Sequence, residues 1–476
     1  MSATSSHSPV ALELARRINA VKYDDLPDAA IHWARVGILD LVGCTIAGSD
    51  YEGTRILTEV LDPRPGPALI FGSDRRVGTL DAAMINGIAS HALDFDDCNN
   101  TFGGHPSAPL LPGLFALADE LGSGGREFIT AYVAGFEAGC KISMGVNMYQ
   151  YTRGWHPTGT LGVFCAAAAC ARLLKLTNEQ TAVAMAVAAS FSSGIKSNFG
   201  TMTKPLHPGQ STRNGLLAAL LAKKGFTANH EAFEHKQGYF EVFNGKGNYD
   251  IDAIFATWGQ PWDIVEPGIA IKSYPCCGST HPAVDIMLQL SMQHDLKPEQ
   301  VQRIDSWTHA RRLEHTNRPD PRSETDAKFS VQYCLLRALA DRKITIEQFE
   351  GDAWKDVRIR NMLPLVHAAP YTTEQFPEDM HFGAEVKVTL KDGRVLSGKV
   401  NECFGRTSAN PLPADILKSK FMGCVARILP EAQGEELHAA IDAFENMKDV
   451  REFTGLMAQR PRGVQRPAVG LERVNA

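Results

Sequence analysis

Several signatures of common enzyme classes are missing from this sequence of 476 residues. No GxGxxG motif follows a strand-like segment and no GxxxxGK(S/T) motif occurs, so nucleotide cofactors lack support. HExxH and GxSxG are also absent, which removes the usual evidence for zinc-dependent and serine-dependent hydrolysis. The ten cysteines contain no CxxC pair, so a structural zinc site is not expected.

The sequence also lacks a strong charge imbalance and a long uninterrupted apolar run. Its 48 basic and 54 acidic residues give a net charge of −6, which argues against nucleic acid or an anionic membrane as the main partner. The N-terminus has no apolar segment after a basic start, and the apolar windows are short or carry charges, so neither a secretory signal nor a span of about 20 residues is expected. The scattered cysteines fit a reducing compartment, so the sequence predicts a cytoplasmic protein.

The pattern of hydrophobic residues predicts a mainly α protein with an α+β second domain. From about residue 8 to 265 the pattern is helical, and the Ala-rich segments 160–175 and 179–196 should form the centre of a helical bundle. Segment 384–400 is predicted to be a hairpin, because its alternating apolar residues lead into Asp392–Gly393. We therefore expect an all-helical domain at 1–266, a smaller α/β domain at 267–403, and a helical tail at 404–476 that rejoins the first domain.

The first candidate site lies in HALDFDDCNNTFGGHPS (91–107). On a helix, His91, Asp94 and Cys98 would share a face. Three aspartates within four residues repel one another, so basic groups, hydrogen bonds or a cap must compensate for their charge. The simpler alternative is a solvated helix end in which Asp97 or Asn99 caps the next helix. Gly-Gly-His-Pro after this acidic cluster, which presents His105, is harder to explain by packing alone.

Two further segments place basic groups beside helix ends. His156 in WHPTGTLG precedes a proline at the start of an Ala-rich helix, where free N–H groups favour anions. Segment 199–214 (FGTMTKPLHPGQSTRN) is predicted to be a loop that carries Lys204 and His207 between two apolar helices. A structural role for His156 and a solvated loop position for Lys204 are the alternatives.

The fourth segment, AIKSYPCCGSTH (270–281), lies at the predicted domain boundary, where clefts commonly form. It holds Lys272 and Cys277. Cys277 could be proposed as a nucleophile, but nothing in the sequence establishes a thiolate, and a small buried thiol is the simpler interpretation.

These four segments, in this order and spacing, together resemble the MmgE/PrpD family, which includes 2-methylcitrate dehydratase, cis-aconitate decarboxylase and iminodisuccinate epimerase. The resemblance runs from the helix at 27–48 to NPLPADILKSKF at 410–421. It implies a helical domain with an α/β lid, usually in a homodimer, and no cofactor. It also implies a small polycarboxylate as the substrate, with catalytic residues and substrate-binding residues carried over by motif: Asp94, His105, His156, Lys204 and Lys272 for catalysis, and Cys98, Cys277 and His315 for binding.

Three of these positions differ from the decarboxylase branch of the family. A threonine and a histidine stand there in place of Cys98 and Cys277, and a tyrosine of that branch aligns loosely with His315. These differences argue against cis-aconitate decarboxylation more than against the family. The resemblance therefore predicts a lyase, either a dehydratase or a decarboxylase, that removes an α-proton or a carboxylate.

Three alternatives to this prediction remain open at the level of sequence. An epimerase of an amino-dicarboxylate such as iminodisuccinate could use the same site. A catalytically silent protein could keep the fold and bind carboxylates. A metal-dependent enzyme could hold Mg²⁺ with Asp94, Asp96, Asp97 and His105, since carboxylate oxygens are the ligands that Mg²⁺ prefers.

Overall fold

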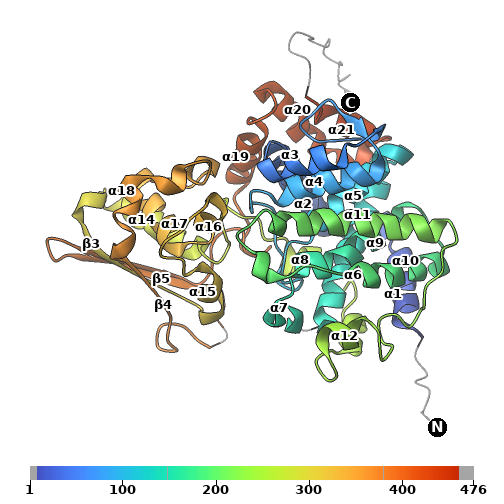
Figure 1. Ribbon diagram of the computed structural model, residues 1–476, viewed down its shortest axis with the longest axis horizontal. Helices are drawn as coiled ribbons and strands as arrows, with labels where there is room; N and C mark the ends of the chain where they lie inside the picture. Colours follow the sequence, from blue (N-terminus) through green and yellow to red (C-terminus); the bar gives the residue numbers. More distant parts are fainter. Residues whose placement is uncertain (1–7, 147, 379, 460–476) are drawn as a thin grey trace, which may run out of the picture.

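The computed structural model describes residues 8–146, 148–378 and 380–459. Two large hydrophobic cores and one small cluster organise these residues. The larger core takes residues from 10–271 and again from 412–457, whereas the smaller core lies within 276–390. Figure 1 shows the helix-rich part and the sheet-bearing part next to each other. The chain therefore leaves the first core once and later returns to it.

The helix-rich part is a bundle packed around one Ala-rich helix, α9 (Gly162–Leu173). Small side chains let α5, α6 and α11 all contact α9. A Cβ atom at Gly215 of α11 would lie only 2.4 Å from the Cβ of Ala166, so only glycine permits this approach. The second Ala-rich helix, α10, packs against α9, α11 and α1. The prediction of an Ala-rich centre is therefore confirmed for α9.

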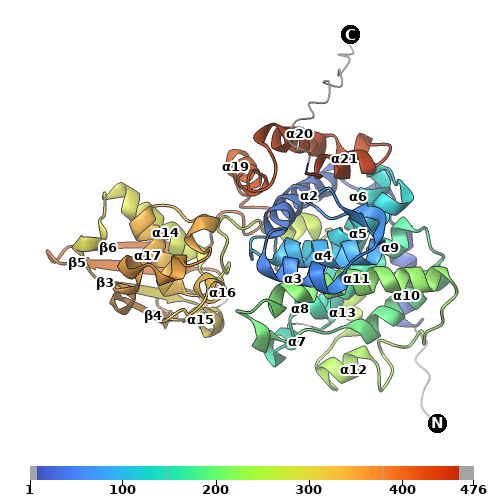
Figure 2. The same cartoon turned by 45° about the horizontal axis from the view of Figure 1, so that its top comes forward.

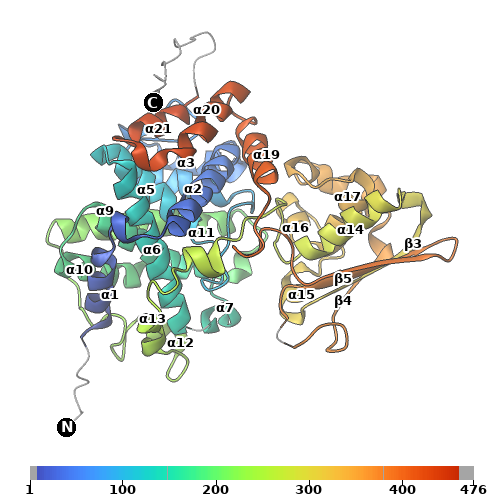
Figure 3. The ribbon, with the colours of Figure 1, turned by 180° about the vertical axis from the view of Figure 1, so that it is seen from behind.

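The helices of this part are α1 (Val10–Ala20), α2 (Asp28–Gly48), α3 (Glu52–Leu61), α4 (Thr79–His91), α5 (Ser107–Leu121), α6 (Gly125–Val146), α7 (Tyr149–Arg153), α8 (Pro157–Thr160), α9, α10 (Asn178–Phe191), α11 (Thr203–Lys223), α12 (Tyr239–Asn244), α13 (Ile251–Ala256), α19 (Ala414–Val425), α20 (Glu431–Asp442) and α21 (Arg451–Leu456). Figure 3 shows the C-terminal helices α19–α21 lying over the bundle.

The prediction that this part is all-helical is wrong in one place. Strands β1 (Pro65–Leu69) and β2 (Arg76–Val77) form a two-stranded antiparallel sheet. The strands are short, and β1 reads PGPAL, so the segment shows no alternation of apolar and polar residues from which a strand could be predicted.

The smaller part contains a mixed sheet with the strand order β4-β3-β5-β6. Its strands are β3 (Val301–Thr308), β4 (Val366–Pro370), β5 (Ala384–Leu390) and β6 (Val395–Val400); β3 pairs parallel to β4 and antiparallel to β5. The predicted hairpin is confirmed as β5–β6, with Val386 and Val388 buried and Gly393 in the left-handed region at φ 88°.

The helices of the smaller part are α14 (His281–Gln293), α15 (Ala310–Thr316), α16 (Glu324–Lys328), α17 (Val331–Asp341) and α18 (Val357–Arg360). Helix α14 packs on α17 and on β5 and β6. Figure 2 shows α14 and α17 beside the strands of this sheet. This arrangement bears out the prediction of a mainly α protein with a smaller α/β part.

Helix α2 is long and apolar enough to span a membrane by length and composition, and within the described residues it alone meets that test. Its C-terminal half is packed inside the bundle, where residues 37–48 are all buried. Contacts with α4 and α19 hold it there. The helix is therefore part of the hydrophobic core, as its interrupting charges predicted.

A buried ion pair connects α2 to the returning C-terminal segment. The Nζ atom of Lys420 in α19 lies 2.6 Å from Oδ1 of Asp40 in α2, and both side chains are almost fully buried. The same ammonium group donates a hydrogen bond to the carbonyl oxygen of Phe95. The ion pair therefore also supports the loop that follows α4, which contributes Asp94 and Cys98 to the cavity described below.

We expect Lys420→Met to lower the free energy of unfolding by roughly 3–5 kcal/mol, because it leaves Asp40 buried without a partner. Equilibrium urea unfolding followed by circular dichroism measures this change. Lys418→Met in the same helix is the matched control: its exposed pair with Glu435 should contribute only about 0–1 kcal/mol. Equal effects of the two substitutions would contradict the role given to the buried pair.

Candidate active site

The acidic cluster after α4 is a buried loop. Helix α4 ends at His91, and Asp94 adopts a left-handed backbone conformation with φ 52°. The predicted helical face of His91, Asp94 and Cys98 is therefore wrong, as is the alternative of a solvated helix end, because the aspartates of this loop are at most 5% exposed. Aspartate tolerates the left-handed region better than most residues. The turn directs the three carboxylates toward different partners, which relieves their repulsion.

Asp94 lies between two lysines. Its Oδ1 atom accepts hydrogen bonds from Lys204 Nζ and Lys272 Nζ, both at 2.8 Å, and Lys272 also donates to the carbonyl oxygen of Asp94. Burial alone would raise the pKa of Asp94, but the two ammonium groups outweigh burial and hold that pKa well below its usual value. Asp94 is therefore a fixed anion that orients both lysines.

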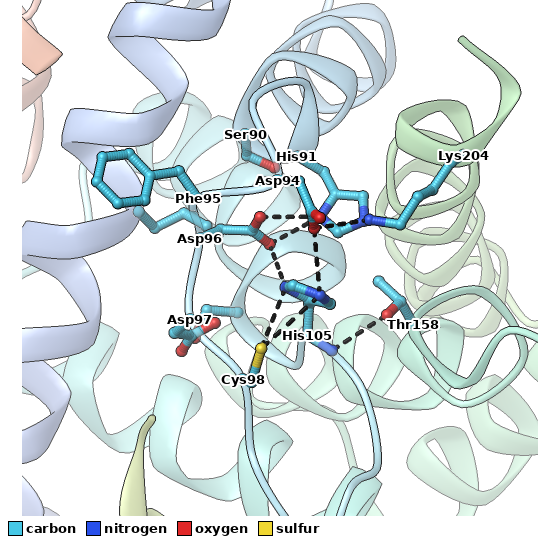
Figure 4. A network of polar contacts seen from close by, with 12 residues as sticks. Ser90, His91, Asp94, Phe95, Asp96, Asp97, Cys98, His105, Thr158 and Lys204 are labelled. Atoms are coloured by element: carbon cyan, nitrogen blue, oxygen red, sulfur yellow. Dashed lines mark hydrogen bonds and ion pairs between the residues drawn. The ribbon is translucent and has the colours of Figure 1, made fainter. Parts of the chain in front are cut away.

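The neighbouring carboxylate of Asp96 binds two imidazoles. His91 Nδ1 lies 2.9 Å from Asp96 Oδ1, and His105 Nδ1 lies 3.0 Å from Asp96 Oδ2. On its other side, His91 Nε2 accepts a hydrogen bond from Lys204 Nζ at 2.9 Å. This network, drawn in Figure 4, links Lys204 to Asp96 through His91 and fixes the position of the His105 ring.

Histidines 105 and 156 have opposite protonation preferences. Burial alone would lower the pKa of His105, but the negative charges of Asp96 and Cys98 raise it to about 10. Burial lowers the pKa of His156 well below its usual value, and the positive charge of Lys204 lowers it further. His156 Nδ1 is paired with Nδ1 of His207 at 2.9 Å, which leaves the Nε2 side of the ring for other contacts. At neutral pH, His105 is an imidazolium and His156 is a neutral imidazole.

The predicted loop at 199–214 is a helix from Thr203 onward, so its assignment as a loop is wrong. Lys204 lies in the first turn of α11 and is only 4% exposed, which also contradicts a solvated position. Pro205 fits there, because first-turn N–H groups need no partner within the helix. Gly209 faces Gly87 of α4, where a Cβ atom would lie 2.6 Å from the Gly209 Cα. This close crossing brings Lys204 to the end of α4.

Two thiols lie near imidazoles in the same region. Cys98 Sγ is 3.7 Å from His105, and although burial raises its pKa, His105 and Lys272 bring it down to about 7. Burial likewise raises the pKa of Cys277, but His315 lowers it to about 6. Cys277 is buried, as the simpler interpretation expects, and the imidazole beside it favours the thiolate.

One cavity of about 170 Å³ joins all of the predicted residues. Its lining includes the eight site residues proposed from the sequence: Asp94, Cys98, His105, His156, Lys204, Lys272, Cys277 and His315. They come from both the helix-rich and the sheet-bearing parts of the chain. Lys204 and Lys272 share a carboxylate although they are far apart in sequence, so the predicted clustering of basic groups exists in the fold.

Several residues of the cavity were missed from the sequence. Tyr151, Arg311, Arg312, Phe382 and Arg406 also line it. The adjacent arginines of HARRL were a visible signal, but nothing in the sequence indicated that Arg406 would meet them. Asp94 is the single carboxylate in the described lining, and it is already paired, so the cavity has an excess of positive charge. Such a cavity suits a multiply charged anion.

The metal-binding alternative fits this arrangement poorly. Potential ligand atoms of His91, Asp94, Asp96 and His105 do lie within 4.8 Å of one another. Asp97 is not in this group, because its Oδ2 accepts a hydrogen bond from Ser107 at 2.5 Å. The carboxylates of Asp94 and Asp96 already face ammonium and imidazole groups at 2.8–3.0 Å. The negative charge of these two carboxylates is therefore already balanced by lysine and histidine side chains of the protein.

Comparison with known proteins gives a consistent result along the chain. Residues 12–252 match the model of the MmgE/PrpD N-terminal domain, and residues 274–446 match that of the MmgE/PrpD C-terminal domain. Human (Homo sapiens) cis-aconitate decarboxylase is 27% identical over 456 residues, covering 93% of each chain.

Two fungal relatives match over similar lengths. Cis-aconitate decarboxylase of Aspergillus terreus is 24% identical, over 95% of this chain and 97% of its own. Mitochondrial 2-methylcitrate dehydratase of Yarrowia lipolytica is 23% identical, over 95% of this chain and 90% of its own. With family models matching most of its length, this chain belongs to the MmgE/PrpD family.

Proposed function

We propose that this protein is a lyase that removes an α-proton or a carboxylate from a small di- or tricarboxylic acid. The observation that carries this proposal is a basic cavity in which Asp94 orients two lysines beside imidazoles of opposite protonation. Membership of the MmgE/PrpD family, with relatives named as cis-aconitate decarboxylases and a 2-methylcitrate dehydratase, supports the same reaction class.

The lysines meet the main energetic requirement of this chemistry. Loss of a proton next to a carboxylate places a second negative charge on that group as an enediolate. Lys204 and Lys272 are already held in place by Asp94, so they stabilise this charge without reorganising. Removing one such preorganised donor commonly costs about 2.7–4 kcal/mol of transition-state stabilisation.

The two histidines carry out different proton transfers. His156, held neutral, is the general base that takes the α-proton. His105, held as an imidazolium by Asp96, is the general acid. In dehydration it protonates the departing hydroxyl group, and in decarboxylation it protonates the carbon that CO₂ leaves. Asp94 already accepts hydrogen bonds from both ammonium groups, so its role is to position the lysines.

The sheet-bearing part contributes Cys277 and His315 to the cavity, and Lys272 lies just before it. Closure of this part as a lid would shield the reacting carbon from water. A homodimer in the cytoplasm remains the prediction from the sequence and its family resemblance. Epimerisation would use the same base and acid on opposite faces of the carbon. A catalytically silent protein would use only the positive charges of the cavity, to bind carboxylates.

Proton NMR in D₂O with methylcitrate, citrate, cis-aconitate, trans-aconitate and iminodisuccinate tests the reaction class. We expect elimination or loss of CO₂ from a tricarboxylic acid, unchanged after exhaustive EDTA treatment, because the carboxylates of the site pair with side-chain cations. Turnover of iminodisuccinate alone would identify an epimerase instead. Binding without turnover or deuterium exchange would favour a silent protein, and loss of activity with EDTA would favour a metal enzyme.

We expect Lys204→Ala to lower kcat/KM by roughly 10²–10³-fold, because it removes one of the two cations that face the developing enediolate. Lys223→Ala is the matched control, since Lys223 is an exposed lysine at the other end of α11. Circular dichroism checks that both variants keep the fold. A folded Lys204→Ala variant with the wild-type rate would remove Lys204 from the mechanism.

We expect kcat/KM to show a broad plateau across neutral pH. Activity requires neutral His156, so it falls only at pH values below the lowered pKa of that group. It also requires protonated His105, so it falls again as pH rises through about 10. Cys98→Ser is the control, because a step near pH 7 that disappears in this variant belongs to the thiol. An acidic limb at 6.5, the ordinary value of histidine, would contradict the assignment of His156.

A further inference from the structure

Two arginines contact the same aromatic ring at the cavity. The guanidinium carbon of Arg312 lies 4.2 Å from the centroid of the Phe382 ring, and that of Arg406 lies 4.0 Å from it. Arg312 belongs to α15, and Arg406 to the segment that returns from β6 to the helix-rich part. All three side chains line the cavity of the candidate active site.

These arginines lack a carboxylate partner. Among residues 8–146, 148–378 and 380–459, no Asp or Glu forms an ion pair with Arg312 or Arg406, whereas the nearby Arg318 pairs with Asp326. The Nε atom of Arg406 is buried and has no hydrogen-bond partner. A buried donor without a partner is unfavourable, and an anion bound beside it would supply the missing acceptor.

Their surroundings keep the two guanidinium groups in place without neutralising them. Arg312 donates hydrogen bonds to the hydroxyl oxygen of Ser279 and to the carbonyl oxygen of His381. Burial lowers the pKa of Arg312 to about 9, and the positive charge of Arg406 contributes to this shift. Both guanidinium groups are therefore held against the same Phe382 ring without a counter-ion, and a bound anion would relieve their mutual repulsion.

The arginine pair lies next to one of the two lysines. A Cβ atom at Gly278 would be 3.7 Å from Lys272 Cε and 4.0 Å from an Nη1 atom of Arg406. Since Gly278 has no side chain, nothing from this residue separates the lysine from the arginine. One ligand can therefore contact Lys272 with one carboxylate and the arginines with another.

We propose that Arg312 and Arg406 bind the carboxylate of the substrate that is farthest from the reacting carbon and so select tricarboxylic over dicarboxylic acids. This inference rests on the proposed function and names the substrate class. Planar guanidinium groups bind carboxylates with two parallel hydrogen bonds, which gives orientation as well as affinity. A dicarboxylic acid whose two carboxylates are held at the lysine end leaves this subsite empty.

Isothermal titration calorimetry with two unreactive acids tests the subsite without requiring turnover. Propane-1,2,3-tricarboxylate carries the distal carboxylate, and 2-methylsuccinate has the same skeleton with one terminal carboxylate removed. In Arg406→Gln and Arg312→Gln, we expect the Kd for the tricarboxylate to rise by about 10- to 100-fold and the Kd for 2-methylsuccinate by less than about threefold. Arg406→Lys should also bind the tricarboxylate more weakly, because lysine keeps the charge but loses the planar fork.

Arg394→Gln is the matched control: it removes the same charge from the exposed turn between β5 and β6, where Arg394 pairs with Asp392. Equal weakening of both ligands would overturn the subsite, as would wild-type protein that does not prefer the tricarboxylate. The two proposals can fail separately. Selective binding that depends on the arginines, without turnover of any acid, would refute the lyase and keep the subsite. Normal turnover with unchanged KM in folded arginine variants would refute the subsite alone.

Discussion

The site depends on one buried carboxylate that holds two ammonium groups. A lysine in a protein interior is stable only with a partner that compensates its lost hydration, and Asp94 serves Lys204 and Lys272 at once. Three segments must meet for this: the turn after α4, the start of α11, and the residues that follow Ala270, whose backbone pairs with that of Cys98. The fold keeps the lysines together, and the lysines in turn keep the acidic turn folded.

Because Asp94 and Asp96 have separate partners, the neighbouring histidines can differ in protonation state. Asp96 stabilises positive charge on His105, whereas His156 faces Lys204 and pairs with His207, whose pKa burial lowers to about 4. In the proposed mechanism, acid and base are thus distinguished by their neighbours and not by residue type. The same division suits elimination, decarboxylation and epimerisation, which explains how one family arrangement can support several reactions on carboxylic acids.

Parts of the fold and of the site could be predicted from sequence wherever a short segment carried the signal by itself. The Ala-rich segment 160–175, the Asp392–Gly393 turn and the four motifs each indicated their own structure or role. The predictions failed where contacts with distant segments determine the backbone conformation. Pro205 and Gly209 suggested a loop, yet proline is compatible with a first helical turn and Gly209 permits the crossing with Gly87. No spacing rule predicts the left-handed turn at Asp94, because its partners come from distant segments.

The arginines show why the cavity needs both parts of the chain. Lys204 comes from the bundle, Arg312 from α15 beside the sheet, and Arg406 from the connection between them. Each part alone would carry an incompletely neutralised group of positive charges, which is unfavourable when buried. An anion that touches both parts relieves this repulsion and gains contacts from each. In the proposed function, binding energy from a carboxylate far from the reacting carbon would then orient the substrate for proton transfer.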